Sequence, residues 1–435
     1  MNYKKKKISF VDISRAHFHS PVTRDIFVEL PPEEARPGYC ARLNKAMYGT
    51  RDAAAAWEAH YTQVMLSMGF IPGRFSAQTF KHETRDLMCY VHGDDFVCLG
   101  SQEDLDWYHA QLQAHLVVKI RGVLGPDPAD THEIVCLNRI VRWCTDAAGH
   151  ERIEYECDPR HQQLVVEHLG LAAQRTKPVT TPGVKGDTGD NDDSELNRQG
   201  CALYRSICMR INYMAADRPD LQFAAKEAAR HMARPTTAAM TQLKRIGRYL
   251  LHAPRSVQVF RRQMFCNTLD IYVDSNHAGC LRTRRSTTGT AMMRGTHTLK
   301  TSSSTQSVVT LSSGESEFLA LVKGTSIGLG ARAMCADMGV DLRVHVRLHT
   351  DSTAAKGIVT RKGVGKVRHL HTPLLWVQDK VANGDLSVHK TPGPTNAADL
   401  GTKFVTAEDI ARHMATLGFE SHTGRSSLAL KAAGA

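Results

Sequence analysis

The sequence predicts a multidomain protein in which α+β and α/β folds follow one another along the chain. Its 435 residues correspond to about two to four domains of ordinary size. Hydrophobic residues make up 42% and charged residues 23%, ordinary globular values that exclude a wholly disordered chain. Short apolar runs dominate the first hundred residues, whereas strand and helix patterns alternate after Thr268, as in an α/β domain with a mixed sheet.

The net charge and the cysteine pattern indicate the kind of partner and the compartment to expect. Lys and Arg number 55 against 44 Asp and Glu, a net charge of +11 and a pI near 9.1. This excess suits a nucleic-acid partner. No apolar run reaches the roughly 18 residues of a membrane span, and the basic N-terminus lacks the apolar stretch of a signal peptide. The 11 Cys form no Cys-x-x-Cys pair, so we expect reduced thiols in a cytoplasmic or nuclear protein that is not secreted.

Three elements are expected in the first part of the chain. Apolar side chains recur at helical spacing over 51–68, which predicts a helix. Two apolar runs, 88–91 and 96–100, flank the polar residues 92–95 and predict a strand, a tight turn and a second strand. A second helix is expected over 103–116.

The middle of the chain predicts a linker followed by helices. Residues 183–200 are rich in Gly and Asp and almost free of apolar side chains, as in a flexible linker. Two helical stretches follow, the second beginning after Pro235. Its cations Lys244, Arg245 and Arg248 point away from the apolar stripe, and either a solvated face or contact with backbone phosphates explains them.

The last part alternates strands and helices. LDIYVD (269–274) and LRVHVRLHTD (342–351) have the period of two of strands. VVTLSSGESEFLALV (308–322) predicts a strand running into a helix, with Ser312 and Glu315 in capping-box spacing. The final residues are Ser- and Ala-rich and predict a frayed tail.

One set of carboxylates lies around the predicted hairpin. Asp94 and Asp95 occupy its turn, and Asp12 ends the early apolar segment ISFVD. Carboxylates that emerge from a buried sheet are costly unless they are paired, and Mg²⁺ prefers such oxygens. The set therefore predicts either a metal-dependent phosphoryl-transfer site or ordinary solvated turn residues.

A second set falls at strand ends and helix starts of the α/β region: Asp274, Glu317, Asp351 and Asp399. Four carboxylates at one edge of a sheet raise one another's pKa and do not all stay ionised without metal. Two Mg²⁺ ions resolve the repulsion, and the natural reaction of such a site is hydrolysis of a phosphodiester. Four unrelated surface acids remain the alternative on spacing alone.

Longer motifs, collinear over about residues 8–415, resemble the Pol polyprotein of copia-type LTR retrotransposons. Those that resemble its reverse transcriptase are FVDISRA, LNKAMYGTRDAAAAW, MGF and HGDDF. Those that resemble its connection are YRSICMRINYMAADRPDLQFA, HMARPT and LKRIGRYL. Those that resemble its ribonuclease H are YVDSNHAG, RRSTTG, TLSSGESEFLAL, HTDSTAA, RHLHTPLLWVQDKV and NAADLGTK.

The resemblance implies a division of the chain and a role for each acid. The implied parts are a partial reverse transcriptase palm (1–125), a thumb or connection segment (126–182), the linker (183–200), a helical connection (201–264), a ribonuclease H-like domain with a mixed five-stranded sheet (265–420) and a disordered tail (421–435). By position, Asp12 and Asp94 would hold the polymerase metals with Asp95 in support. The implied nuclease metal ligands are Asp274, Glu317, Asp351 and Asp399, with Glu315 left as the helix cap.

This chain departs from the family at several positions. The family's fingers segment, which holds the incoming triphosphate, would precede the first residue. His17 stands where the family has the aromatic residue that screens the sugar 2′-hydroxyl, and HGDD replaces a turn with two apolar residues before the acids. Asn276 replaces a second nuclease acid. His389 lies ten residues before Asp399, where some ribonucleases H carry a proton-shuttling His.

The expected function is Mg²⁺-dependent hydrolysis of the RNA strand of an RNA–DNA hybrid, with Mn²⁺ as the alternative ion. The expected nuclease domain is attached to a polymerase that is too incomplete to extend a primer. Expected partners are the hybrid, a primer-template, and integrase and protease segments upstream, in virus-like particles of the cytoplasm or in the nucleus. The alternative is a catalytically inactive, basic nucleic-acid-binding remnant of a decayed element. Gly-Asp-Asp alone would also suit an RNA-templated RNA polymerase, which the downstream nuclease motifs disfavour.

Overall fold

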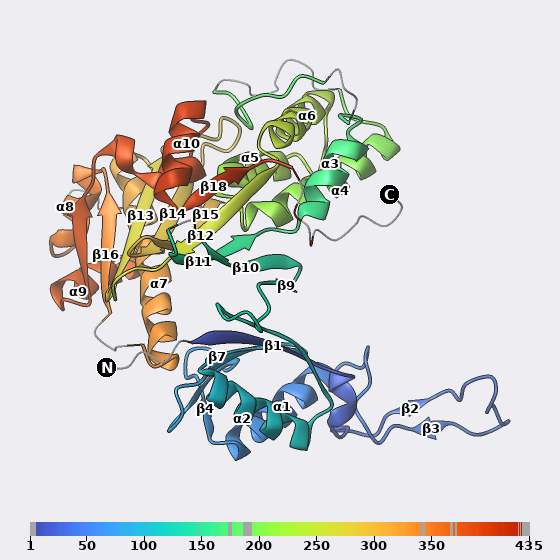
Figure 1. Cartoon of the computed structure of the whole chain (residues 1–435). Coiled ribbons are helices and arrows are strands. Elements are labelled where there is room, and N and C mark those ends of the chain that lie inside the picture. Colours follow the sequence, from blue (N-terminus) through green and yellow to red (C-terminus); the bar gives the residue numbers. More distant parts are fainter. Residues whose placement is uncertain are drawn as a thin grey trace. The chain divides into compact units, whose positions relative to one another are not determined.

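The computed structural model describes residues 6–146, 148–172, 176–185, 194–340, 344–365, 369, 372–424, 426 and 428. The chain divides into two compact units, the first formed by Met1–Leu137 with Ala333–Leu342 and the second by Asn138–Arg332 with Arg343–Ala435. Each contains sheets covered by helices (Figure 1). The predicted combination of α+β and α/β folds is therefore confirmed.

The first unit is built on a six-stranded antiparallel sheet. Its elements are β1 (Lys7–Ile13), η1 (Ala16–His19), β2 (Phe27–Val28), β3 (Ala41–Arg42), α1 (Ala53–Ser67), β4 (Phe70–Pro72), β5 (Thr79–His82), β6 (Met88–His92), β7 (Asp95–Gly100), α2 (Gln102–His115), β8 (Val118–Leu124) and β9 (Glu133–Cys136). The strand order is β4-β5-β6-β7-β1-β8. The predicted helices and the predicted hairpin are thus confirmed.

Helices α1 and α2 cover one face of this sheet. Trp57, Tyr61 and Met65 of α1 and Leu105 and Tyr108 of α2 are buried in one core with the inward-facing residues of β1, β6 and β7. Ser101 caps α2 by accepting a hydrogen bond from the Asp104 N–H. In register, Val11 pairs with Phe96, which belongs to this core, and the next pair along, Asp12 with Asp95, points to the opposite face.

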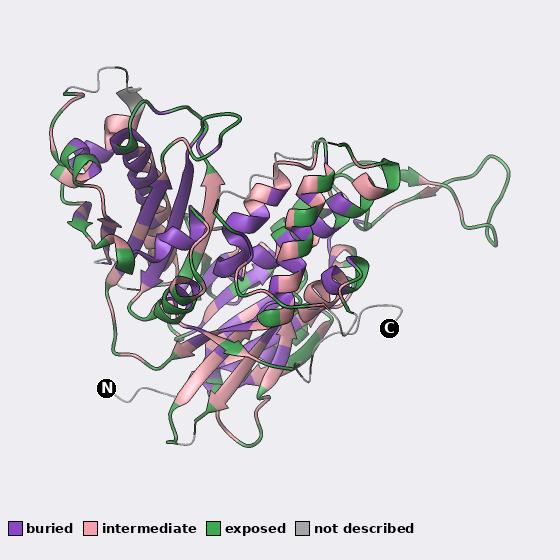
Figure 2. Cartoon of the chain, turned by 90° about the horizontal axis from the view of Figure 1, so that it is seen from above, coloured by how far each residue is buried: buried purple, intermediate pink, exposed green. Residues whose placement is uncertain are grey.

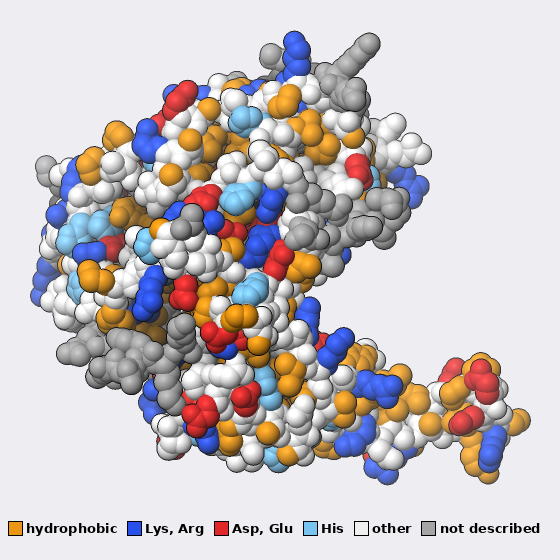
Figure 3. Space-filling view, viewed as in Figure 1, with side chains coloured by type: hydrophobic (Ala, Val, Ile, Leu, Met, Phe, Trp, Pro, Cys, Tyr) orange, Lys and Arg blue, Asp and Glu red, His pale blue; other side chains and the backbone are white. Residues whose placement is uncertain are grey.

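Residues between η1 and α1 form an extended arm that contains the short hairpin β2–β3 (Figures 1 and 3). Most of its residues are exposed, including the large apolar side chains Phe27 and Tyr39. Arg42 pairs with Asp25 across the hairpin. Such an exposed ion pair contributes little to stability.

The second unit contains two sheets and most of the helices. Its elements are β10 (Arg139–Thr145), β11 (Glu151–Glu156), α3 (Pro159–His168), α4 (Arg198–Ala215), α5 (Pro219–Ala229), α6 (Thr237–His252), β12 (Arg255–Arg261), β13 (Thr268–Asn276), β14 (Thr287–Arg294), β15 (His297–Thr305), α7 (Ser313–Asp337), β16 (His345–Thr350), α8 (Thr353–Thr360), η2 (Thr372–Leu375), α9 (Trp376–Ala382), β17 (Leu386–Lys390), η3 (Gly393–Thr395), η4 (Ala397–Gly401), α10 (Ala407–Thr416) and β18 (Phe419–His422). Helix α7 begins here, and its last turn is assigned to the first unit.

Segments that are distant in sequence share one of these sheets. Strands β10, β11, β12 and β18 are antiparallel neighbours, and helices α3–α6 enclose a core of their own. The expected linker lies partly outside the described residues, at 186–193, and its last three residues begin α4. The tail expected at 421–435 also begins too early in the prediction, because residues 421 and 422 belong to β18 and pair with β12.

The other sheet has five strands in the order β15-β14-β13-β16-β17, as predicted for a mixed sheet. Strand β13 is antiparallel to β14 and parallel to β16, which is parallel to β17. Figure 2 shows how completely β13 and β14 are buried. Because β13 and β16 run in the same direction, their C-terminal ends lie at one edge of the sheet.

Helix α7 contacts this sheet through glycines, at positions where a side chain would collide with the strands. A Cβ atom at Gly324 would lie 2.7 Å from Val273 Cγ1, and one at Gly328 would lie 2.7 Å from Val346 Cγ1. By length and composition α7 could cross a membrane, which the expectation that no apolar run is long enough did not anticipate. Its buried Glu317 and its glycine contacts with β13 and β16 are those of a core helix.

The strand predicted at 308–311 is wrong. Strand β15 ends at Thr305, residues 306–312 form no strand, and α7 begins at Ser313. Val308, Val309 and Leu311 are exposed, so this apolar run lacks the buried surface that would have made it a strand. The capping prediction is confirmed in part: Ser312 Oγ accepts from the Glu315 N–H, whereas Glu315 Oε2 accepts from the Leu311 N–H, one residue before the cap, at 2.9 Å.

Candidate metal-dependent nuclease site

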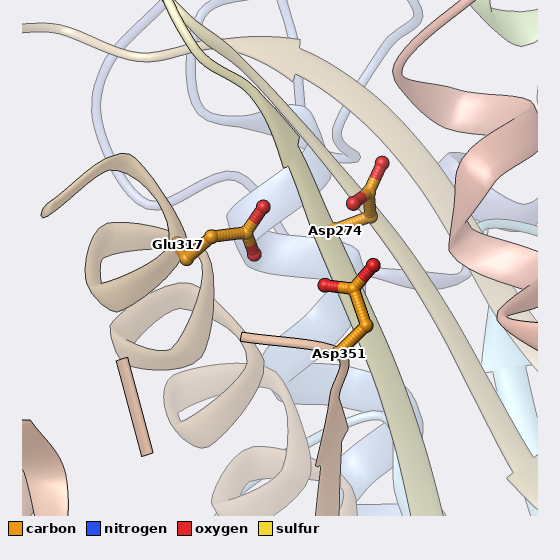
Figure 4. Close-up of side chains that lie close together, drawn as sticks. All are labelled: Asp274, Glu317 and Asp351. Atoms are coloured by element: carbon orange, nitrogen blue, oxygen red, sulfur yellow. The ribbon is translucent and has the colours of Figure 1, made fainter. Parts of the chain in front are cut away.

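Three carboxylates converge at the edge where β13 and β16 end (Figure 4). Asp274 lies near the end of β13, Asp351 directly follows β16, and Glu317 lies in the second turn of α7. Each offers one oxygen, and these oxygens all lie within 4.8 Å of one another. This spacing allows one cation to be bound by all three.

Hydrogen bonds hold two of these side chains in place. The Ser275 N–H donates to Glu317 Oε1 at 3.0 Å, which ties the helix to the end of β13. The Thr402 hydroxyl donates to Asp274 Oδ2. Glu315 faces elsewhere and pairs with His369 at 2.9 Å. The structure therefore brings Glu317, not Glu315, to the other acids.

Burial and like charge disfavour ionisation in this cluster. Burial, with Asp274 and Asp351 next in effect, raises the pKa of Glu317 to about 9. Burial and the Asp274 carboxylate also raise the pKa of Asp351. Glu317 Oε2 and Asp399 Oδ1 are buried and accept no hydrogen bond from any described residue. Unpaired carboxylate oxygens at this spacing fit a divalent cation that prefers oxygen ligands.

Asp399, the fourth predicted acid, lies beside Asp274 but outside the compact set of three. It belongs to η4, which packs against β14 at a glycine: a Cβ atom at Gly289 would lie 2.3 Å from Ala398 O. Gly289 is the register partner of Asp274, so this close approach brings Asp399 to the site. Burial and the Asp274 carboxylate raise the pKa of Asp399.

Two functional residues were not predicted from the sequence. Lys403 Nζ lies 2.8 Å from Asp399 Oδ2. Thr402 binds Asp274. Both belong to the segment NAADLGTK, and the four-residue separation of an acid and a lysine was the available signal. Asn276, which replaces a family acid, donates to Thr402 O at 2.7 Å and so holds this turn.

The predicted polymerase acids are arranged more openly. Asp12 and Asp95 are register partners on the face of the sheet that α1 and α2 leave uncovered, and the Ile13 N–H donates to Asp94 O at 2.9 Å. Burial raises the pKa of Asp95, while Arg121, at 3.4 Å, opposes this shift. These three acids, all of them described, do not form a compact set like that of Asp274, Glu317 and Asp351.

His17 lies in η1 and stacks on Tyr48, with ring centroids 4.3 Å apart and planes at 24°. Phe18 meets the same tyrosine edge-on at 5.7 Å. The imidazole is thus held by aromatic contacts in a segment near β1. A ring that is smaller than the family's aromatic residue and able to form hydrogen bonds occupies this position.

The three cations predicted to lie on the polar face of α6 differ in their exposure and in their hydrogen-bond partners. Lys244 is exposed. Arg245 donates to Thr181 Oγ1 at 2.9 Å and Arg248 donates to Lys177 O at 2.7 Å, so both bind the chain segment that precedes the linker. The solvated face that the sequence left open therefore applies at most to Lys244.

His389 is on β17, where its ring stacks on His349 with centroids 5.5 Å apart. Its Nε2 lies 2.8 Å from Ser387 Oγ, and His349 Nε2 lies 2.7 Å from Asp270 Oδ1. These partners do not belong to the carboxylate set.

Comparisons with known proteins agree with the motifs. Residues 2–125 match the family described as reverse transcriptase (RNA-dependent DNA polymerase). The chain is 24% identical over 407 residues to the retrovirus-related Pol polyprotein from transposon RE1 of Arabidopsis thaliana, covering 90% of this chain and 26% of that protein. It is 22% identical over 423 residues to the one from transposon TNT 1-94 of Nicotiana tabacum, covering 92% and 30%. The resemblance to copia-type Pol polyproteins is confirmed.

The chain spans about a quarter of the length of these relatives. Among solved structures, it is similar to a ribonuclease H1 isolated from compost, with 23% identity, 34% of this chain and 97% of that chain covered, and a TM-score of 0.24. It is also similar to a foamy viral protease-reverse transcriptase in complex with double-stranded DNA, with 10% identity, coverage of 89% and 59%, and a TM-score of 0.22. TM-scores this low carry no weight for function, so the site must be judged from its own residues.

Proposed function

We propose that this relative of copia-type Pol polyproteins hydrolyses the RNA strand of RNA–DNA hybrids in a reaction that depends on Mg²⁺, with Mn²⁺ as a substitute. The observation that carries the proposal is the convergence of Asp274, Glu317 and Asp351 on one point, with Asp399 alongside. Orphaned carboxylate oxygens and raised pKa values are what a site built for divalent cations has when it is metal-free.

The chain's own residues would prepare this site in defined ways. Bound Mg²⁺ would supply charge stabilisation for the attacking water and for the leaving oxygen of the phosphodiester. Asp274, Glu317, Asp351 and Asp399 would be its ligands. Thr402 fixes the carboxylate of Asp274, and the Ser275 N–H fixes that of Glu317. Ligands held in this way need little reorganisation when metal and substrate bind.

The substrate would be recognised by its shape and backbone. A hybrid duplex has near A-form geometry and presents 2′-hydroxyls in a shallow minor groove, which proteins read with little regard to sequence. Cations on the protein would contact phosphates and would position the duplex without specifying bases. The net charge of +11 favours such a partner.

Cleavage of a hybrid with a labelled RNA strand by the full chain in Mg²⁺ tests the proposal. Asp351→Asn keeps the shape of the side chain but weakens a metal ligand. Removal of outer-shell partners costs about 10–100-fold, so loss of a direct ligand should reduce cleavage by more than about 100-fold. Asp379→Asn, an exposed acid of α9, is the matched control. Equal cleavage by Asp351→Asn and the control would refute the assignment, and hybrid binding without cleavage by the parent chain would favour the inactive remnant.

For the polymerase half, we propose that the chain does not extend a primer at a useful rate. Nucleotidyl transfer depends on positioning and charge stabilisation because the protein has little covalent chemistry to do. The described residues Asp12, Asp94 and Asp95 do not form a compact set of ligand oxygens, and Arg121 already contacts Asp95. Primer extension on an RNA template measures this. Any residual synthesis should discriminate poorly against ribonucleotides, and His17→Tyr should sharpen the choice. Robust deoxy-selective synthesis by the unmodified chain would contradict both expectations.

A further inference from the structure

The fourth carboxylate of the nuclease site has a partner that the other three lack. Among the described residues no ion pair reaches Asp274, Glu317 or Asp351, whereas Asp399 Oδ2 lies 2.8 Å from Lys403 Nζ. The other oxygen of Asp399 is buried and accepts no hydrogen bond from a described residue. The four acids therefore divide into a set of three with unmet charge and a fourth that is already paired.

The backbone fixes where Lys403 begins. The N–H groups of Thr402 and Lys403 both donate to Asp399 O, at 3.1 and 3.3 Å, and Asn276 Nδ2 donates to Thr402 O. Beyond this turn the lysine is free to move, because half of its side chain is exposed, against 12% for Asp399. The ammonium can therefore leave Asp399 without any change in the fold.

The contact between Lys403 and Asp399 affects how a metal ion could bind at Asp399. An ammonium and a divalent cation cannot both contact Asp399 Oδ2 closely, since their like charges repel strongly at such distances. A first cation at Asp274, Glu317 and Asp351 would not displace Lys403. A second cation that used Asp399 would have to.

We propose that Lys403 is a positioning residue that holds Asp399 in the metal-free site and must be displaced before a second divalent cation binds. This inference rests on the proposed function, because it concerns the same carboxylates. The two ions then bind with unequal affinity: the first enters the set of three, and the second competes with a cation tethered to the chain.

Titration of the metal-stripped full chain with Mn²⁺ alone, with free Mn²⁺ followed by electron paramagnetic resonance, tests this without any substrate. The parent chain should show two affinities that differ by at least about 10-fold. Lys403→Met should tighten the weaker one and bring the two close together, whereas Lys403→Arg should keep them apart. Lys380→Met, which removes an ammonium from the ion pair with Asp385, is the matched control.

The outcomes separate this inference from the proposed function. If Lys403→Met has the affinities of the parent chain, the displacement is wrong although the nuclease assignment stands. If no Mn²⁺ binding is sensitive to Asp351→Asn, both are wrong. Asp399→Asn gives an answer even if Lys403→Met does not fold: it should lose the weaker affinity and keep the stronger one, and loss of the stronger one instead would overturn the order of binding.

Discussion

The acid cluster should make the stability of the metal-free protein fall with rising pH, and Glu317→Gln should remove most of this dependence. The pKa of Glu317 is raised in the folded chain, chiefly by burial. Between its unfolded and folded pKa values the native state therefore holds a proton that the unfolded state has lost. Stability of the metal-free protein should accordingly fall as the pH rises through this window. Gln stays neutral at every pH and can still accept the hydrogen bond from the Ser275 N–H.

The size of the effect follows from the shift. The pKa of Glu317 moves from 4.5 to about 9, and each unit corresponds to about 1.36 kcal/mol. Raising the pH from 4.5 to about 7.5 should therefore cost the metal-free protein up to about 4 kcal/mol through this group alone. In thermal unfolding of a unit this large, that is a decrease in Tm of roughly 5–15 °C.

Thermal unfolding in EDTA at several pH values between 5 and 9 measures this. The parent chain should lose stability steadily with rising pH, and Glu317→Gln should lose much less, with a residual slope from Asp351 and Asp399. Saturating Mg²⁺ should restore the parent chain, since a ligand that binds only the native state stabilises it, but should do less for the variant. Equal pH slopes for the two proteins in EDTA would refute the reasoning.

Two further predictions concern the second unit. Arg218 and Asp220 form a buried ion pair at 2.6 Å. Arg218→Met should lower the free energy of unfolding by about 3–5 kcal/mol, because the buried carboxylate loses its cation and keeps only the hydrogen bond from Tyr249. In the same denaturant titration, Arg412→Met, which breaks the more exposed ion pair with Asp409 on α10, should lower it by less than about 1 kcal/mol. The logarithm of the affinity for the hybrid should fall linearly with the logarithm of the salt concentration, and Lys244→Ala should reduce the steepness of this fall by about one. Arg245→Ala and Arg248→Ala should instead lower Tm and leave the steepness unchanged. If all three variants change it equally, the arginines contact phosphate as well.

The positions of Asp274 and Asp351 could be predicted from the sequence because strand periodicity is a local pattern. LDIYVD and LRVHVRLHTD each end in an acid, and the parallel pairing of β13 with β16 brings those ends to one edge. The choice of Glu317 over Glu315 came from the resemblance to the family, and the hydrogen bonds of Glu315 at the start of α7 agree with it.

What could not be predicted depends on contacts between distant segments. Val308 and Leu311 have the apolar character of a strand, yet no neighbour buries them and they remain exposed. The role of Lys403 required knowing that its turn packs against β14 at Gly289. Arg245 and Arg248 have the spacing of a solvated helix face, but both donate hydrogen bonds to the segment that contains Lys177 and Thr181.

The close packing of α7 has a consequence for reading sequences of this kind. The reach from Glu317 to Asp274 is set by how near the helix lies to β13, and that separation depends on Gly324, whose Cβ would press on Val273, the residue next to Asp274. An alanine there would push α7 away from β13 by a few tenths of an ångström or more, which metal ligation tolerates poorly. Under the proposed function, a copy of this gene can therefore lose activity while keeping every acid, so intact carboxylates alone do not identify an active copy.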